Sequence, residues 1–270
     1  MSFYTSLNGM KNAQTSLGVI AHNIANSETY GFKRSRAEFS EIVAASRLTD
    51  PRLVQGIGSR VAAVNQNFAL GPVEQTGSGL DLALTGDGFF TIRSPGDGAT
   101  LYTRKGSFTL AGDGYIADSS GNRLQMFPTD ANGTVTSNSL IDAVIPAINA
   151  AGAEFAGVIV ANDGVVNVSF ADGSVEPIGS VAVAGFFAPT GLKRVGSSNW
   201  ESTGLSGVAS YGSPGTGQYG SLLSGALERS NVDIAEELVG LITAQRNFQA
   251  NAKAIDTATQ ISQTVINLRT

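Results

Sequence analysis

The two ends of the chain carry matching hydrophobic patterns, in which apolar residues recur at alternating steps of four and three. On a helix of about 3.6 residues per turn, this spacing draws one stripe along the helix. The stripe at the front, here the N-terminal seam, comprises Phe3, Leu7, Met10, Gln14, Leu17, Ala21 and Ile24. The matching C-terminal seam comprises Ile234, Leu238, Leu241, Gln245, Phe248, Ala252 and Ile255. The pattern predicts two long terminal helices, each with a stripe that needs a partner.

Local signals place the ends of both helices. The first helix is predicted from Phe3 to Asn26, because the pattern breaks before Gly31. Ser230 is predicted to open the last helix, with Asp233 in the place of the acidic residue of a capping box. Glu236 and Glu237 would then complement the positive end of the helix dipole.

Between the helices, short apolar runs alternate with turn dipeptides. The turns are predicted at six pairs that tolerate positive φ angles, namely Asp87-Gly88, Asp97-Gly98, Asp113-Gly114, Asn132-Gly133, Asp163-Gly164 and Asp172-Gly173. The runs between them include LDLAL, GFFTIR, SFTLA, YIAD, GVIVA, VVNVSF and VAVAGFF. This texture predicts a mainly β middle domain that is small, all-β and rich in hairpins.

The predicted organisation has five parts. An N-terminal assembly helix (1–31) is followed by an extended connector (32–76), an all-β domain (77–190), an irregular connector (191–229) and a C-terminal assembly helix (230–270). Within the first connector, one strand is predicted at Arg60 to Phe68. The second connector is rich in Gly, Ser and Thr, which predicts irregular structure.

Composition narrows the class of protein. The chain has 270 residues, 42% of them apolar, which is enough for a sizeable core, and a net charge of −5. Because phosphate neutralisation needs clustered Lys and Arg, nucleic acid is not expected as a partner. There are no cysteines, so neither a disulfide nor a cysteine-based metal site is expected. We expect no cleaved signal peptide and no membrane insertion, since no run approaches about 18 consecutive apolar residues.

The search for catalytic, cofactor and metal residues nominates none. His22 is the only histidine and falls within the first predicted helix. The match to GxGxxG at residues 215–220 follows Pro214 and a Ser/Gly-rich loop, without the strand that a nucleotide site requires. Most of the Asp residues placed by the pattern precede Gly in turns, without the spacing of a calcium loop. We therefore expect no enzyme activity and no cofactor.

The two seams favour self-assembly. An isolated helix pair buries one face of each helix, which gains little against the entropy of ordering it. Packing against copies from neighbouring subunits would bury more, so we expect a polymer in which these helices are ordered. The alternative is a two-helix stalk within a monomer.

Three stretches resemble the bacterial flagellar rod and hook family. Residues 2–39 are similar to the opening of that family, with its N-I/L-A-N segment at residues 23–26 and its G-F-K turn at residues 31–33. LDLALTGDGFFTI, at residues 80–92, resembles the entry into the family's β domain. Residues 224–255, SGALERSNVDIAEELVGLITAQRNFQANAKAI, resemble its C-terminal helix. The three motifs stand in the family's order.

The resemblance implies a structural subunit that is exported without a cleaved signal by the type III export apparatus. Such subunits polymerise helically around a central export channel and contact neighbouring rod, hook, hook-filament junction and hook cap proteins. Their terminal helices form a coiled-coil-like inner layer, and their β domains form an outer layer. By this analogy the subunit interface would be formed, partly between subunits, by Phe3, Leu7, Met10, Leu17, Ile24, Ile234, Leu238, Leu241, Phe248 and Ile255.

The sequence leaves the choice between members of the family open. The Met-Ser-Phe start, SRAEF at residues 35–39 and residues 242–255 are more similar to a hook protein, the universal joint that transmits torque to the filament. Residues 77–190 suffice for one β domain, whereas typical hook proteins carry an additional one, and residues 164–186 resemble the distal rod protein. We expect a short hook protein, with the distal rod protein of the basal body, a rigid drive shaft, as the alternative. A cell-wall-cleaving enzyme on the same fold is a further alternative.

Overall fold

The computed structural model describes residues 2–44 and 55–267, and these form two compact units. The first unit takes residues from 1–27, 34–67 and 232–270, and the second takes 28–33 and 68–231. Residues 45–54, in the middle of the predicted connector 32–76, lie outside the described residues, as do residues 1 and 268–270 of the two predicted terminal segments.

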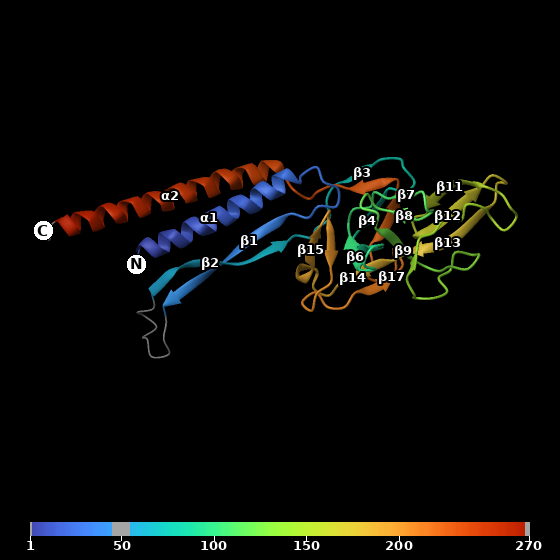
Figure 1. The fold of residues 1–270 in the computed structure, drawn as a ribbon, viewed down its shortest axis with the longest axis horizontal. Coiled ribbons are helices and arrows are strands. Elements are labelled where there is room, and N and C mark those ends of the chain that lie inside the picture. The colour runs from blue at the N-terminus through green and yellow to red at the C-terminus, as the bar shows by residue number, and fades with distance from the viewer. Residues whose placement is uncertain (1, 45–54, 268–270) are drawn as a thin grey trace. The chain divides into compact units, whose positions relative to one another are not determined.

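The first unit consists of two helices and a β-hairpin (Figure 1). Helix α1 runs over Ser2–Ala25 and helix α2 over Ile234–Asn267. Strands β1 (Ser35–Ala44) and β2 (Gln55–Gln66) pair antiparallel and pack against α1. Both terminal helices are thus confirmed. The bounds of α1 lie within one residue of the predicted Phe3 and Asn26, whereas α2 begins four residues after the predicted Ser230 and is described as far as Asn267.

The residue that caps α2 is Asp233, and the prediction of Ser230 was wrong. Oδ1 of Asp233 accepts hydrogen bonds from the backbone N–H groups of Ala235 at 2.8 Å and Glu236 at 3.3 Å. One side-chain oxygen thereby satisfies two donors that the first helical turn leaves without an intrahelical partner.

The two helices run antiparallel and meet through small residues. Gly9 of α1 lies beside Asn251 of α2, and Gly240 of α2 lies beside Ile20 of α1. Ala13 and Ala244 are the buried alanines of this contact, each 6% exposed. The absence of large side chains at these positions lets the helix backbones approach closely.

The predicted extended connector is a long hairpin over its described residues, so the expectation of a single strand was wrong. The pairing runs from Ser35 opposite Gln66 to Ala44 opposite Gln55, with register shifts at Glu38/Phe39 and Ile42/Val43. An extra residue in one strand inverts the inward and outward order of the side chains beyond it. The bulges therefore hide the period of two by which a strand is recognised in a sequence.

The second unit is a β domain whose largest sheet follows the strand order β11-β12-β13-β9-β5-β6-β16-β15. The strands of the whole unit are β3 (Val73–Gln75), β4 (Leu82–Thr85), β5 (Phe89–Arg93), β6 (Thr100–Thr103), β7 (Thr109–Leu110), β8 (Ile116–Ala117), β9 (Arg123–Phe127), β10 (Ile141–Asp142), β11 (Phe155–Val160), β12 (Val165–Phe170), β13 (Val175–Val181), β14 (Val183–Gly185), β15 (Lys193–Gly196), β16 (Asn199–Glu201), β17 (Ser210–Gly212), β18 (Ser221–Ser224) and β19 (Ala226–Glu228). A short 3-10 helix, η2, spans Pro189–Gly191.

The segment 191–229 is part of this domain, and its prediction as an irregular connector was wrong. It contributes β15 to β19, of which β18 pairs with β4 and β19 pairs with β3. These strands are short and separated by Gly and Ser, so no single run is long enough to show a period. Each of these segments becomes a strand by pairing with a strand that is distant in the sequence.

All six predicted turn glycines have positive φ angles, so those turns are confirmed. Four of the dipeptides close hairpins between strands that pair directly: β5-β6, β7-β8, β11-β12 and β12-β13. In these four turns the Asp side chain also accepts a hydrogen bond from the backbone N–H two residues on. The Asp-Gly pairs therefore have a structural role in the turns.

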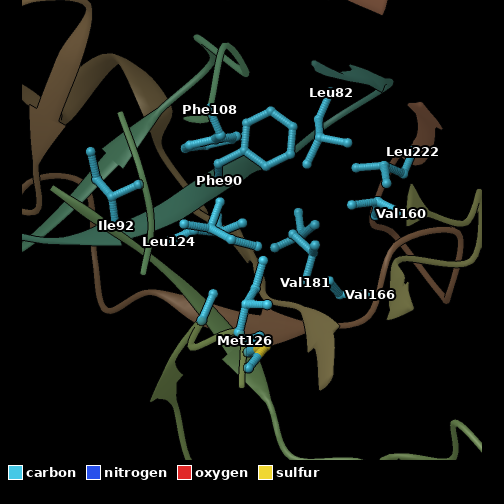
Figure 2. Packing of buried hydrophobic residues seen from close by; sticks show 14 of the residues in the cluster. Leu82, Phe90, Ile92, Phe108, Leu124, Met126, Val160, Val166, Val181 and Leu222 are labelled. Carbon is cyan, nitrogen blue, oxygen red and sulfur yellow. The ribbon is translucent and has the colours of Figure 1, made fainter. Parts of the chain in front are cut away.

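The core of the second unit is built from side chains of strands β4, β5, β9, β11, β12, β13 and β18, as Figure 2 shows. Phe90, Leu124 and Leu82 are fully buried, and Phe90 and Phe108 meet edge to face with ring centroids 5.6 Å apart. A second, aromatic cluster surrounds Trp200, the only tryptophan of the chain. Trp200 thus reports on the packing of this unit.

A buried charge cluster lies where the segments 28–33, 68–72 and 226–231 of the second unit meet. Glu228 and Lys33 have no exposed side-chain area, and the Lys33 ammonium donates to Oε1 of Glu228. The backbone N–H of Gly71 donates to the same oxygen at 2.9 Å, and Arg104 Nη1 lies 3.4 Å from Oε2. The Gly31 N–H donates to the Glu228 carbonyl at 2.8 Å.

The two cations of this cluster also bind backbone carbonyls. Lys33 Nζ donates to the Ala69 carbonyl at 2.8 Å, and Arg104 Nη2 donates to the Gly86 carbonyl at 2.7 Å. Burial lowers the pKa of Lys33, and the charge of Glu228 counteracts that shift. One carboxylate therefore compensates two buried cations and joins three segments that are distant in the sequence.

Replacing Glu228 with Gln should destabilise the second unit strongly. The substitution leaves Lys33 and Arg104 buried without a counter-ion, which costs on the order of 3–5 kcal/mol. Lys33→Met should cost less, because Arg104 still pairs with Glu228. Urea unfolding followed by Trp200 fluorescence measures both. The control is Glu236→Gln, at a carboxylate that is 61% exposed; equal losses for Glu228→Gln and Glu236→Gln would contradict the role of the cluster.

Two glycines of α1 should respond differently to substitution by Ala. A Cβ at Gly18 meets nothing within 4 Å, so Gly18→Ala should stabilise the first unit by about 1 kcal/mol through helix propensity. A Cβ at Gly9 would come 2.5 Å from Oδ1 of Asn251, which should cancel that gain. Thermal unfolding followed by circular dichroism at a helix wavelength compares them. Adding Asn251→Ala to Gly9→Ala should restore the gain, and equal effects of the two single variants would show that the helices do not meet at Gly9.

Candidate assembly surface

The predicted seams lie beside the contact between the two helices, not within it. On α1 the contact residues Gly9, Ala13 and Ile20 are each followed directly by a seam residue, and the same holds for Gly240, Ala244 and Asn251 on α2. Successive residues of a helix are about 100° apart around its axis. On each helix, the seam therefore lies about 100° around the axis from the residues that contact the other helix. Because the helices are antiparallel, this rotation brings both seams to the same side of the pair. Both seams therefore form one surface, which we call the helix-pair face.

The helix-pair face is apolar and partly open. Phe3, Ile234 and Leu238 are 43%, 44% and 47% exposed. The other large apolar members of the two seams are half-buried along the edge of the helix contact; they are Leu7, Met10, Leu17, Ile24, Leu241, Phe248 and Ile255. Within one chain, the helices meet mainly through the residues one position earlier, which include Gly9, Ala13, Gly240 and Ala244. The seams thus retain apolar area that the described part of the first unit leaves open.

Two glutamines interrupt the helix-pair face at one level. The register that sets Gly9 beside Asn251 and Ile20 beside Gly240 brings Gln14 to the level of Gln245, and both side chains are exposed. A polar position within an apolar seam favours one register of packing over others, at a cost in stability.

The hairpin is attached to α1 on a side away from its seam. Asn23, which is 1% exposed, accepts a hydrogen bond from the Ser35 N–H at 2.9 Å and donates to the Ser35 carbonyl at 2.8 Å. Asn12 Nδ2 donates to Ser59 Oγ at 2.7 Å. The first residue of the N-I-A-N segment therefore holds the start of β1 against α1, and the described residues of the hairpin leave the helix-pair face uncovered.

Arg34 connects the start of the hairpin to the first turn of α2. Its Nη1 and Nη2 donate to the two oxygens of Glu236 at 2.7 and 2.9 Å, and its Nε lies 2.6 Å from Oε1 of Glu237. The hydrogen bonds from Arg34 lower the pKa of Glu236. A carboxyl group whose pKa is lowered by folding stabilises the protein at pH values above its ordinary pKa. That stability is lost as the pH falls through the lowered pKa. Since Glu236 is largely exposed, we expect this effect to be small and sensitive to salt.

The described residues show no arrangement typical of catalysis. Within residues 2–44 and 55–267, no group of three His, Cys, Asp or Glu side chains could hold a metal ion. His22 is exposed on α1, with Nδ1 3.4 Å from Asn26 Nδ2. The GxGxxG match forms turns between β17 and β18, and no helix follows it. In the described part of the chain, no helix is long and apolar enough to cross a membrane.

Sequence reasoning missed the polar residues that organise this surface. Asn23, Arg34 and Ser35 act through partners in other elements, and nothing in their spacing identifies those partners. Asn23 and Lys33 do fall within the N-I-A-N and G-F-K segments, and these segments were the available signal.

Family models match both ends and the middle of the chain. A model described as "Flagella basal body rod protein" matches residues 3–33, and one described as "Flagellar hook protein FlgE/F/G D1 domain" matches residues 83–168. The model "Flagellar basal body rod FlgEFG protein C-terminal" matches residues 223–268. The first and last matches include the two seams, and the middle one falls within the second unit.

Relatives match over the whole chain. The flagellar basal-body rod protein FlgG of Bacillus subtilis is 35% identical over 288 aligned positions, covering 99% of this chain and 98% of that protein. FlgG of Borreliella burgdorferi is 33% identical, with 99% and 98% coverage. The flagellar hook protein FlgE of Salmonella typhimurium is 28% identical over 411 positions, covering 100% of both chains.

Among solved structures, the flagellar hook protein FlgE2 of Helicobacter pylori overlaps 72% of this chain and 43% of its own, with 13% identity and a TM-score of 0.25. That superposition is too poor to support an argument about the fold, so the assignment depends on the sequence matches. With three family models in order and rod relatives above 30% identity along the full length, the chain belongs to the flagellar hook and rod axial protein family.

Proposed function

We propose that this chain is a rod subunit of the flagellar basal body, corresponding to the distal rod, and not a hook subunit. The observation that carries the choice is the length of the alignments. The match to the hook protein of Salmonella typhimurium spans 411 positions, so at least 141 of them (411 − 270) have no counterpart in this chain. The match to the rod protein of Bacillus subtilis spans 288, which leaves a minimum of 18 (288 − 270).

The fold agrees with this choice. The second unit, 28–33 and 68–231, has one main sheet, two two-stranded sheets and two hydrophobic clusters, of which the cluster around Phe90 is the larger. The short connections between its strands support the rod, because a hook protein is expected to carry an additional domain. Identity is also higher to the two rod proteins, at 35% and 33%, than to the hook protein, at 28%. The motifs at residues 35–39 and 242–255 are more similar to a hook protein, so a hook subunit is the second candidate function.

The helix-pair face is proposed as the surface through which subunits polymerise around a central export channel. It is an apolar strip on two long helices that the described part of its own unit leaves partly open. In a helical polymer, each copy offers its neighbours the same surfaces, so repeated contacts can bury this strip along the whole assembly. The proposed partners are other copies of the chain, neighbouring axial proteins and the type III export apparatus. We propose a purely structural role, with export that needs no cleaved signal.

The fraction of the flagellum that contains the chain tests rod against hook. Mass spectrometry should find the chain in basal bodies whose hooks have been sheared off, with the amount per basal body unchanged by shearing. A chain that leaves with the sheared hooks would establish the hook as its site. The known hook protein of the same preparation serves as the control for complete shearing.

Leu238→Asp should prevent polymerisation without unfolding the protein. Leu238 is 47% exposed, so an Asp there is tolerated in the monomer, whereas its burial between subunits would place an unpaired charge in an apolar contact. The protein concentration needed for assembly should rise at least about tenfold, equivalent to about 1.4 kcal/mol. Sedimentation of the polymer measures it.

Thr243→Asp is the matched control, because Thr243 is an exposed residue of α2 outside the seam. It should leave assembly unchanged, and circular dichroism at a helix wavelength should show the helices of the first unit intact in both variants. Normal polymers of Leu238→Asp would remove the helix-pair face from the interface.

A further inference from the structure

The second unit contains a pocket that lies outside the proposed assembly surface. Its volume is about 410 Å³, a size typical of pockets that bind small ligands. Aromatic residues form much of its wall, among them Phe89, Phe186, Phe187 and Tyr219, and the charged residue Arg104 also lines it. An apolar concave surface with a few polar groups is the usual form of a ligand site.

Arg104 brings a buried cation with an unused donor to this pocket. The residue is 2% exposed, and its Nη1 and Nη2 donate to the Leu84 and Gly86 carbonyls at 3.2 and 2.7 Å. Its Nε is also buried, and no described residue provides it with a hydrogen-bond acceptor. Since a buried N–H without an acceptor is costly, an acceptor placed in the pocket would gain more from Nε than from an exposed donor.

The charges behind the pocket favour an anionic acceptor. Two buried cations, Lys33 and Arg104, share the single buried carboxylate of Glu228. Asp87 also lines the pocket and acts on Arg104 electrostatically, but no salt bridge joins the two in the described part of the chain. Because Asp87 is exposed, water screens its charge, and it offsets the buried positive excess only in part. A carboxylate that reached Nε would complete the compensation.

Packing keeps the pocket wall in place. Added Cβ atoms at Gly185 and Gly212 would lie 3.2 and 2.1 Å from ring atoms of Tyr219, so this ring rests directly on the backbone. The Tyr219 hydroxyl lies 2.7 Å from Ser210 Oγ. A wall that is already ordered adds little conformational entropy cost to binding.

Apolar surface continues beyond the mouth of the pocket. Phe187 and Val208 line the pocket and are 100% and 93% exposed. Single exposed apolar residues are common, but two that adjoin a concave apolar site are typical of a binding surface. A small acid inside the pocket would leave both uncovered, whereas a peptide that ends in the pocket would cover them. Capture of a terminal carboxylate is a recurring mode of peptide recognition.

We propose that this pocket binds the C-terminal end of a partner protein whose last residue is large and apolar. The terminal carboxylate accepts a hydrogen bond from Arg104 Nε, and the last side chain packs against Phe89 and Phe186. The preceding residues cover Phe187 and Val208. All these residues belong to the second unit, so the site is present in the unassembled chain and does not depend on the proposed function.

Calorimetric titration of the unassembled full-length chain tests the site with two peptides that differ in one group. The first is N-acetyl-Ala-Ala-Phe with a free carboxylate, and the second is the same peptide as its C-terminal amide. The acid should bind at least about tenfold more tightly, because only the acid forms a hydrogen bond between two charged groups at Arg104. Equal affinities, or no binding of the acid, would overturn the proposal.

Two variants test the anchor. Arg104→Lys keeps a positive charge beside Glu228 but lacks Nε, so it should lose most of the preference for the acid. Trp200 fluorescence, recorded before titration, checks that this variant folds. Asp87→Asn, at an exposed residue, decides the question if Arg104→Lys does not fold. It should tighten binding of the acid and leave that of the amide unchanged; equal effects on both peptides would contradict an anionic anchor.

The surface beyond the mouth separates a peptide end from a small acid. Phe187→Ser should weaken binding of the peptide acid and leave 3-phenylpropionate binding unchanged. Val175→Ser is the matched control, at a residue 62% exposed that is not part of the pocket, and should change neither. If 3-phenylpropionate binds as tightly as the peptide, or if Phe187→Ser has no effect, the site takes small acids and the peptide end is ruled out.

Discussion

The buried carboxylate of Glu228 is the interaction on which the arrangement of the chain depends. The chain passes between its two units at residues 27/28, 33/34, 67/68 and 231/232. Glu228 contacts Lys33 and Gly71, each within a few residues of a passage, and itself precedes the last one by a few residues. A single buried charge thus fixes the ends of the segments that belong to the β domain. Since burying ions is costly unless they are paired and hydrogen-bonded, this geometry tolerates few alternatives.

This constraint would suit the proposed rod subunit, which has to transmit torque. The chain begins and ends in helices that offer an apolar face, and its middle folds as a separate β domain. Within that domain, the entering and leaving segments are joined to each other by charge and hydrogen bonds, so load on one segment is shared by the others.

The sequence predicted what depends on local patterns. The steps of four and three identified both helices, and the Asp-Gly pairs identified the turns, because a helix stripe and a positive φ angle are properties of adjacent residues. The hairpin at 35–44 and 55–66 was missed because its bulges break the alternation. Strands β15 to β19 were missed because each depends on a partner far away in the sequence. The motif resemblance gave the family, while alignment length favoured the rod over the hook that the motifs suggested.

The sequence predicted which residues form the assembly surface, but not how those residues are arranged. Seam spacing gave the residues of the helix-pair face, and it could not reveal that Gly9, Ala13, Gly240 and Ala244 form the contact inside one chain. Small residues contribute little to a hydrophobic pattern, and their role in packing can be recognised only when two backbones are seen to lie close together. The roles of Asn23 and Arg34 were likewise invisible, since each depends on the position of another element.

Electron cryo-microscopy of the polymer formed by the purified full-length chain tests the central claim most directly. A rod subunit that assembles through the helix-pair face should give straight tubes in which Phe3, Leu238 and the other seam residues are buried between subunits around a central channel. Curved tubes would contradict the assignment to the rod. Tubes in which the helix-pair face remains exposed to solvent would contradict its role in assembly.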